Sequence, residues 1–547
     1  CSQEGAVTPT VSPTAKPEGT NEPVETVEPE SDIKWSGTIS YAPYMFGPID
    51  EDEVTPQIEE ALLEYGYDVK LEPIYIENSQ YTELINLRIT SKEAPDLFIS
   101  GNGSRIRELY DQGAIASWDK DFFIEKSPAI YEHVEKGGID GRLLDFVDMW
   151  WDLSSIDGQM VTIPSFTESG SMINKAVIYR QDWLDNLGIT ELPYTIEEFS
   201  ELMYKFAKED PDGNGQDDTY GYSASMIGIL FGAHDGWNGY PSGSPQWYNR
   251  DSEMISADIL PTNIDVLALL AEHYADGLLD PEFITGENQG GYWAISHPFI
   301  NGRIGVSAHA SIDHYRLPEV LGDEGGPVTQ EYYKVNGEGA EFTYGPFIAG
   351  PTGNYGYLKG YGASLGEGTV YDVRLNNDTE KLSAIFEIKN IFATDDDIAM
   401  MAGFGIEGKH YEMETVNGKE IAKALLPSNE ELNAKGVMTQ RSLSGEPMPF
   451  SEKYINFSFY NNPSIANRFD IQSQEQYGGG YISDLYTDTE STALYRPDLI
   501  TYRDETFTKI ITGELGSDYW DTYVEEWNNR GGKILTEEAQ EFWNSKN

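Results

Sequence analysis

The chain has 547 residues, of which 93 are acidic and 36 basic, so its formal net charge is −57. This length exceeds one ordinary hydrophobic core and predicts two or more domains or lobes. The charge argues against nucleic acid as a partner, because phosphate binding needs clustered Lys and Arg, and it disfavours a polyanionic ligand.

Residues 1–32 have the composition of a disordered linker. They hold five Pro, five Thr and seven acidic residues against one Lys, and they contain no aromatic side chain. Such a segment cannot bury enough apolar surface to offset its ordering entropy. Cys1 is the sole cysteine of the chain, which excludes an internal disulfide. We predict that Cys1 carries a lipid that anchors the protein outside the membrane; a plain thiol is the alternative.

Alternating strands and helices follow this linker. The pattern predicts strands over 38–44, 68–76 and 94–100, with helices over 54–66 and 81–90 between them. Helices of this length between strands are typical of βαβ units on a parallel sheet. The fold class is therefore expected to be α/β.

Further helices are predicted along the rest of the chain. Residues 194–210 begin with Thr195 as a cap and continue with apolar residues three and four apart. Residues 263–279, 378–393 and most of 502–544 are also expected to be helical. The sequence contains no run of about 18 apolar residues, so no transmembrane helix is predicted.

The segment DPDGNGQDDTYG, residues 210–221, has the spacing of a calcium loop. Oxygen-bearing side chains alternate, a glycine stands at the sixth place, and the backbone carbonyl at the seventh place adds a ligand. The predicted ligands are Asp210, Asp212, Asn214, Gln216 and Asp218. Gly221 stands where such loops place a glutamate, so the closing ligand must come from Asp218, Asp217, Thr219 or elsewhere. A solvated Asp/Gly turn is the alternative.

No catalytic motif stands out. The sequence has no HExxH, GxSxG or P-loop, and its seven histidines show no metal-ligand spacing. His309 and His314, five residues apart, are interpreted as polar surface or pocket lining. Because 93 acidic residues guarantee fortuitous carboxylate pairs, such pairs say nothing about glycoside hydrolysis. These residues therefore indicate no class of enzyme.

Several aromatic residues occupy loop-like contexts rich in Gly and Pro. A flat ring stacks on the apolar face of a pyranose while neighbouring polar groups bond its hydroxyls. The tryptophans proposed for this role are Trp150, Trp237, Trp247 and Trp293; packing in a core or between lobes is the alternative for each. Trp183, Trp520, Trp527 and Trp543 lie on helical patterns and are expected to be structural.

From about Trp35 onward, the order and spacing of several short motifs are specific. They include APDLF, GAIASWD, IDGQMVTIP, AVIYRQDWLDNLGI, YADGLLDPEF, FINGRIGVSAHA, FGIEGKHYE and WDTYVEEWNNRGG. In this order the chain resembles an extracellular solute-binding protein of the sugar ABC-transporter class, in the lipoprotein branch of Gram-positive bacteria.

This resemblance implies two α/β lobes joined by crossing strands, with ligand held in the cleft between them. Lobe 1 is expected to comprise 33–168 and 308–360, and lobe 2 to comprise 169–307 and 361–547 with the calcium loop. The family's calcium loop corresponds to Asp210, Asp212, Asn214, Gln216 and Asp218, and Thr219 stands at the tenth place, where the family usually has an acidic residue. Hinge closure around ligand would precede delivery to a membrane permease.

The resemblance also projects cleft positions onto loops that follow strands, where ligands of open α/β sheets bind. They are Tyr44, Phe46, Asn102 within 100–103, Trp237, His309, Asp313, Glu407 and Tyr411. Length and aromatic content favour an oligosaccharide, and acidity favours a neutral one. We expect a lipid-anchored monomer on the outer face of the cell membrane that holds a structural calcium ion. The alternatives are a surface carbohydrate-active enzyme and a binding protein for a peptide or another solute.

Overall fold

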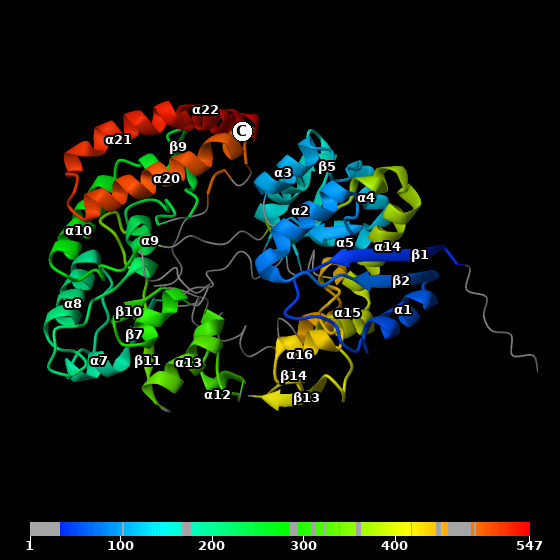
Figure 1. Ribbon diagram of the computed structural model, residues 1–547, viewed down its shortest axis with the longest axis horizontal. Helices are drawn as coiled ribbons and strands as arrows, with labels where there is room; N and C mark the ends of the chain where they lie inside the picture. Colours follow the sequence, from blue (N-terminus) through cyan, green and yellow to red (C-terminus); the bar gives the residue numbers. More distant parts are fainter. Residues whose placement is uncertain are drawn as a thin grey trace, which may run out of the picture.

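The structure is a computed structural model, and it describes most of the chain beyond the linker. The described residues are 33–100, 103–138, 141, 143–166, 177–241, 243–284, 294–308, 312–321, 323–337, 340–356, 363–416, 418–444, 450–457, 483–485 and 488–546. They form two α/β lobes with separate hydrophobic cores (Figure 1). No helix among these residues is both long and apolar enough to cross a membrane.

A five-stranded sheet in the order β2-β1-β3-β12-β6 lies in lobe 1. Its strands are β1 (Trp35–Ala42), β2 (Tyr67–Pro73), β3 (Leu97–Ile99), β6 (Thr162–Phe166) and β12 (Ala363–Tyr371). β1 pairs in parallel with β2 and β3, whereas β12 runs antiparallel to β3 and β6. The predicted βαβ units and the α/β class are thus confirmed. The arrowheads of β1 and β2 point toward the other lobe (Figure 1).

Helices cover both faces of this sheet because successive strand residues point to opposite faces. Leu97 belongs to the core beneath α1 (Thr55–Glu64) and α14 (Thr379–Thr394), and Phe98 to the core beneath α2 (Tyr81–Ser91) and α3 (Gly103–Asp111). The other helices of lobe 1 are α4 (Lys120–Lys126), α5 (Pro128–Glu135), α6 (Val147–Ser154), α15 (Asp396–Phe404), α16 (Asn429–Ala434), α17 (Arg441–Ser444) and α18 (Glu452–Ile455). Two hairpins complete the lobe: β4 (Ser155–Ile156) with β5 (Gln159–Met160), and β13 (Tyr411–Val416) with β14 (Lys419–Ala424).

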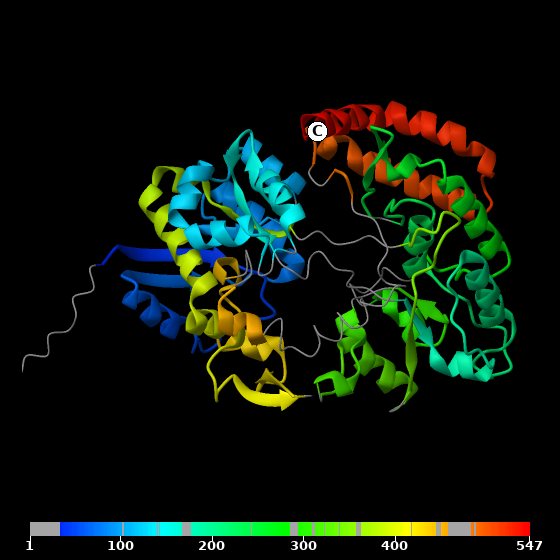
Figure 2. The same ribbon diagram turned by 180° about the vertical axis from the view of Figure 1, so that it is seen from behind.

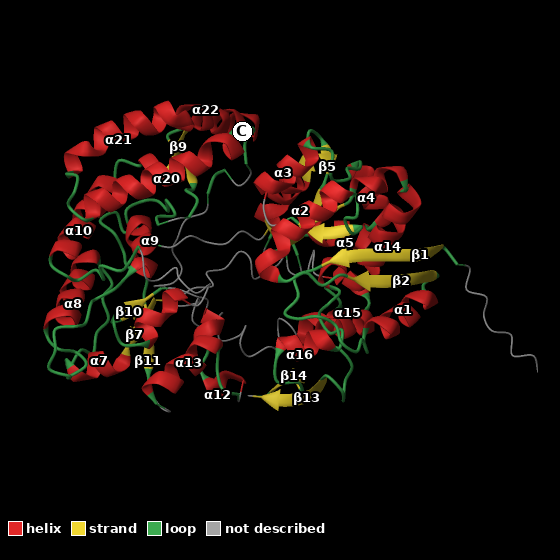
Figure 3. Cartoon of the chain, in the orientation of Figure 1, coloured by secondary structure: helices red, strands yellow, loops and turns green. Residues whose placement is uncertain are grey.

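Lobe 2 is built on a smaller sheet. Strands β10 (Val306–Ser307) and β11 (Phe342–Gly345) flank β7 (Val177–Arg180), and both run antiparallel to it. Isolated parallel bridges join Tyr220 to Ile304 and Tyr222 to Leu279. A separate hairpin pairs β8 (Trp247–Arg250) with β9 (Glu253–Ser256). Figure 3 shows the strands of this lobe among its helices.

The helices predicted over 194–210, 263–279 and most of 502–544 are present in lobe 2, which also contains helices that were not predicted. The helices of this lobe are α7 (Gln181–Asn186), α8 (Ile196–Lys208), α9 (Ala224–Ala233), α10 (Asn263–Ala275), α11 (His297–Ile300), α12 (Pro318–Leu321), α13 (Pro327–Asn336), α20 (Thr492–Ile511), α21 (Trp520–Trp527) and α22 (Lys533–Lys546). Helix α8 begins with a reciprocal capping box between Thr195 and Glu198. The long helices α20 to α22 lie along one side of the lobe (Figure 2).

The predicted lobe boundaries were wrong in the middle of the chain. Tyr315, Tyr332 and Ile348 belong to the lobe 2 core, so residues 308–356 do not form part of lobe 1. Residues 363–457 belong to lobe 1, because β12 completes its sheet and α14 packs in its core. The chain therefore changes lobe between 166 and 177, between 356 and 363, and between 457 and 483. The last of these crossings was not predicted.

Candidate ligand-binding site

A first candidate ligand-binding surface lies in lobe 1, at the edge of the sheet where β1 and β3 end. Tyr81, the first residue of α2, donates its hydroxyl to the carbonyl of Ala42 at 2.5 Å and accepts from the amide of Ile99 at 3.0 Å. The Tyr44 ring meets Tyr81 edge-on, with centroids 4.7 Å apart. Tyr44 and Ser100 both line a small pocket of about 10 Å³ at this carboxyl edge of the sheet.

Arg105 and Asn86 line the same pocket. The Arg105 guanidinium contacts the Oδ1 atom of Asn86 and lies 2.6 Å from Glu108, and its side chain is 18% exposed. A cation held by partners on two helices can donate hydrogen bonds to a ligand without large rearrangement. The sequence interpretation missed Arg105, although its place just after a strand was an available signal.

The loop after β1 also carries Phe46. Its ring is 51% exposed, and its amide donates to the Oδ1 atom of the buried Asn433 at 2.5 Å. The loop is thereby fixed to α16, which leaves the apolar ring facing solvent. An exposed ring on an anchored backbone suits stacking against a sugar face.

Glu407 and Tyr411 lie close to that loop. Lys409, between them in sequence, bonds Glu53 at 3.1 Å and holds the pKa of that carboxyl below its usual range. Glu407 is exposed, whereas Tyr411 is buried, and burial followed by the Glu407 charge raises the pKa of its phenol. Of the two predicted positions, Glu407 presents its side chain to solvent.

A second candidate edge lies in lobe 2, at the amino end of α9. The hydroxyls of Ser225 and Ser307 are 3.2 Å apart, and the amide of Ala308 donates to Ser225 at 3.3 Å. Ser223, the N-cap of α9, is fully buried and its hydroxyl makes no hydrogen bond. Ser307 ends β10, so these hydroxyls stand at a strand end, as ligand groups of α/β sheets do.

The three described tryptophan candidates differ in burial. Trp150 is fully buried in lobe 1, where its indole nitrogen donates to the carbonyl of Pro164 at 3.0 Å. Trp247 is buried in the lobe 2 core. Trp237 is half-buried and packs so closely on α9 that a Cβ on Gly228 would lie 2.6 Å from its ring. In this conformation Trp150 and Trp247 have no surface to offer a ligand, and Trp237 has some.

Four predicted positions lie outside the described residues: Cys1, Asn102, Trp293 and His309. The backbone of Asp313 lies in a short helix over 312–315. Its side chain is outside the described part of the chain.

The loop at 210–218 is held together by hydrogen bonds among its own residues. The amide of Gly215 donates to both carboxylate oxygens of Asp210, at 3.2 and 3.1 Å, and Gly215 takes the left-handed conformation that the turn requires. Asn214 donates to Asp212 at 2.7 Å and to Asp218 at 3.3 Å. Burial, and further the charges of Asp218 and Asp210, raise the pKa of Asp212. Like charges are therefore gathered around one point.

The end of this loop departs from the calcium-binding pattern. The Thr219 hydroxyl is buried and donates to the carbonyl of Phe206 at 2.9 Å, and Gly221 lies so close to Met203 that a Cβ would meet it at 2.8 Å. Neither residue can supply the closing ligand from this position. In the part of the chain that the structure describes, no three His, Cys, Asp or Glu residues form a group that could hold a metal ion.

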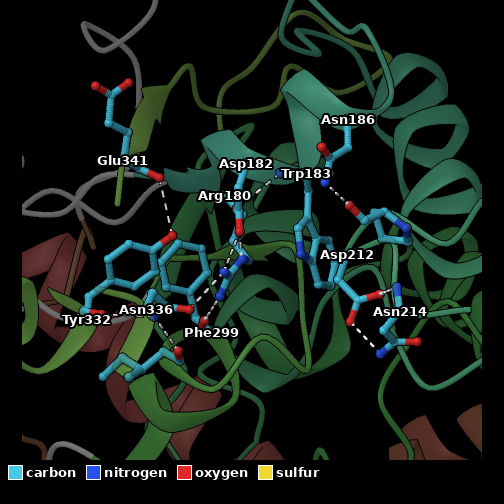
Figure 4. A network of polar contacts seen from close by, with 12 residues as sticks. Arg180, Asp182, Trp183, Asn186, Asp212, Asn214, Phe299, Tyr332, Asn336 and Glu341 are labelled. Atoms are coloured by element: carbon cyan, nitrogen blue, oxygen red, sulfur yellow. Dashed lines mark hydrogen bonds and ion pairs between the residues drawn. The ribbon is translucent and has the colours of Figure 1, made fainter. Parts of the chain in front are cut away.

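The loop is tied to the core of lobe 2 through α7 (Figure 4). Asn186 donates to the carbonyl of Pro211 at 2.8 Å. At the other end of α7, the buried Arg180 donates to Asp182, to the carbonyl of Phe299 and to Asn336. The network makes the loop a fixed part of the lobe rather than a free turn.

Two α/β lobes joined by three chain crossings, with polar and aromatic groups at strand ends, define a two-lobed binding protein. Residues 51–372 match the family model described as "Bacterial extracellular solute-binding protein". The chain belongs to this family. It is an extracellular solute-binding protein and not an enzyme.

Two curated relatives from Bacillus subtilis (strain 168) match most of the chain. Lipoprotein LipO is 23% identical over 93% of this chain and 92% of its own length. The polygalacturonan/rhamnogalacturonan-binding protein YtcQ is 22% identical over 71% of this chain and 70% of its own length. These matches extend the likeness beyond residues 51–372.

Solved structures share the fold over nearly the whole chain. The Streptococcus pneumoniae ABC-transporter substrate-binding protein FusA in complex with kestose has a TM-score of 0.65 at 17% identity, covering 94% of this chain and 99% of its own. The alginate-binding protein AlgQ2, solved without calcium ion, has a TM-score of 0.62 at 16% identity, covering 93% and 98%. At these identities the likeness establishes the two-lobed fold.

Proposed function

We propose that the protein captures an oligosaccharide between its two lobes and delivers it to the permease of an ABC importer. The observation that carries this proposal is the lobe 1 edge, where Tyr44, Ser100 and Arg105 meet at the ends of strands that point toward the other lobe. Rings and hydrogen-bonding groups side by side suit a sugar, which has apolar faces and a rim of hydroxyls. FusA in complex with kestose and the polygalacturonan-binding YtcQ both bind glycans.

Each lobe contributes a set of groups to the proposed site. In lobe 1, Tyr44 and Phe46 supply rings, Arg105 supplies donors, and Glu407 accepts. In lobe 2, Trp237 supplies a ring, and Ser225, which is partly exposed, supplies a hydroxyl. Asn102, Trp293, His309, Asp313 and Tyr411 stay predictions from the sequence. Trp150 and Trp247 are left out of the proposed site because both are buried in cores.

We propose a neutral oligosaccharide as the ligand. The net charge of −57 repels an anionic chain at low ionic strength, and Arg105 is the one cation that lines the described lobe 1 pocket. YtcQ binds an acidic polysaccharide, so the sign of the ligand charge has to be measured. Calorimetry with matched neutral and uronate-containing oligosaccharides decides it: preferential binding of the uronate would contradict the neutral ligand, and binding of a peptide alone would contradict a glycan.

We propose that the loop at 210–218 holds a structural calcium ion. Asp210, Asp212, Asn214 and Asp218 would supply side-chain oxygens, and Gln216 would supply its backbone carbonyl. The charges of Asp210 and Asp218, which together with burial raise the pKa of Asp212, support this proposal. The calcium would neutralise these charges. Gly221 stands where a complete loop has a glutamate, which predicts weaker binding than in a complete loop.

Calcium removal tests this part of the proposal. A ligand present at a hundred times its dissociation constant stabilises the folded state by about 2.7 kcal/mol. Calcium added to the chelated protein should therefore raise the melting temperature by several degrees, and Asp210→Asn should abolish the rise. An Asp185→Asn variant, which changes an exposed carboxylate outside the loop, should keep it. No calcium-dependent rise in the parent protein would contradict the site.

We propose that a lipid on Cys1 anchors the protein, as a monomer, to the outer face of the cell membrane. The relative LipO is named a lipoprotein, and the acidic Pro- and Thr-rich segment after Cys1 suits a flexible tether. Fatty-acid labelling in a Gram-positive host should tag the protein, and Cys1→Ser should release it into the medium. Unchanged labelling of that variant would contradict the anchor.

A further inference from the structure

The last helix connects the two lobes. The Nζ atom of Lys546, at the end of α22, contacts a carboxylate oxygen of Asp152 on α6, although α22 belongs to lobe 2 and α6 to lobe 1. Figures 1 and 2 show the carboxy-terminal end of α22 beside lobe 1. The two side chains are 40% and 22% exposed, so the ion pair is in contact with solvent.

Both partners stand on rigid supports. Helix α22 is fixed to lobe 2, because Gln540 accepts from the amide of Met254 at 2.8 Å and Leu535 is buried in the lobe 2 core. Helix α6 is fixed to lobe 1 through the fully buried Trp150. Contact between Lys546 and Asp152 therefore depends on how the lobes are placed, since neither helix can move alone toward the other.

The two lobes also face each other across an open pocket. A pocket of about 340 Å³ lies between α3 of lobe 1 and the start of α20 of lobe 2. It is lined by Arg107, Glu108, Asp111, Gln112, Asp488, Thr489, Glu490 and Ala493. Four of these eight residues are acidic, and three of the four pair with arginines of their own lobe: Glu108 with Arg105, Asp111 with Arg107, and Asp488 with Arg496. Because the lobes are not closely packed at this pocket, an ion pair that spans both lobes can influence the distance between them.

We propose that Lys546 and Asp152 form an interlobe latch that holds the two lobes in the arrangement of this structure. The latch rests on the proposed function only for its effect on affinity: a ligand that binds between the lobes in this arrangement binds more tightly when the arrangement is already favoured. The placement of the lobes is a property of the protein without ligand. Exposed ion pairs change such equilibria by about two- to fivefold.

The test compares Lys546→Gln and Asp152→Asn with a matched control, Lys533→Gln. Lys533 lies on the same helix and faces Glu537 of α22, so this variant loses the same charge without touching lobe 1. Small-angle scattering or interlobe fluorescence transfer on the full ligand-free chain at low ionic strength reads the lobe distance. Both latch variants should raise the ratio of molecules with separated lobes to molecules in the parent arrangement by about two- to fivefold. The double variant should show no larger change than either single variant. The control should match the parent.

Salt supplies the second readout. At about 1 M salt the difference between the latch variants and the parent should disappear, because the screening length falls to about 3 Å. An unchanged lobe distance in both latch variants at low salt, or additive effects in the double variant, would overturn the latch. Failure of the protein to bind any glycan would leave the ligand-free distance measurement intact, so the latch and the proposed function fail separately.

Discussion

Removal of the Tyr81 hydroxyl tests whether the lobe 1 edge is built as described. This one oxygen donates to the carbonyl of Ala42, at the end of β1, and accepts from the amide of Ile99, at the end of β3. Tyr81 itself is buried, as are both strand residues. Tyr81→Phe keeps the ring and its contact with Tyr44 but leaves both backbone groups without this partner.

The expected cost follows from these two contacts. A buried donor or acceptor that loses its partner costs about 1–3 kcal/mol. Because the structure can relax partly around the two groups, the total loss in the free energy of unfolding should be about 2–4 kcal/mol. Because the freed strand ends carry Tyr44 and Ser100, ligand affinity should also fall.

Urea unfolding of Tyr81→Phe, followed by a probe in lobe 1, measures this cost. The matched control is Tyr41→Phe, since Tyr41 lies in β1, is fully buried, and its hydroxyl makes no hydrogen bond. The control should change the free energy of unfolding by less than about 0.5 kcal/mol. Equal stability of the two variants, or a loss below about 0.5 kcal/mol for Tyr81→Phe, would refute the clamp.

Three further outcomes are expected. Trp237→Ala should weaken sugar binding at least about tenfold, equivalent to about 1.4 kcal/mol. The volume-reducing Trp247→Phe should lower the melting temperature with little effect on affinity. Calorimetry in which Trp247→Phe weakens sugar binding more than Trp237→Ala would contradict the site. Burial lowers the pKa of His133 and of His273 to about 4, below the unfolded value, so their protonation favours unfolding. Stability should fall as the pH drops from about 6.5 toward 4, by up to about 1.4 kcal/mol per pH unit for each histidine, and a His133→Phe variant that loses as much as the parent would contradict this. Gly228→Leu should displace the Trp237 ring and reduce affinity; an unchanged indole fluorescence spectrum would count against their contact.

The local elements of the fold were predictable from the sequence, whereas the assignment of segments to lobes was not. Apolar spacing and the Thr195 cap located α8 within two residues, because both signals act within a few turns. The strand around 363–371 has no local mark that shows which sheet it joins. Its pairing with β3 and β6 depends on contacts with residues hundreds of positions away.

The candidate site divides in the same way. The turn at 210–218 is recognisable from the sequence because its Asp and Gly pattern lies within consecutive residues, and its calcium ion stays a prediction. Trp150 and Trp247 were assigned to ligand because their neighbours resemble loop residues, but burial depends on packing that neighbours do not reveal. Arg105 and Ser225 were missed because both lie in helices and nothing in their neighbouring sequence marks them. They become candidates only because the fold places them next to the ends of strands.

The central claim is that the protein binds an oligosaccharide between its lobes. Calorimetry of the calcium-loaded protein against a panel of neutral oligosaccharides, uronate-containing oligosaccharides and peptides tests it most directly. The account predicts saturable one-to-one binding of a neutral oligosaccharide that is weakened by Trp237→Ala. Saturable binding of a peptide, with no heat from any oligosaccharide, would contradict it.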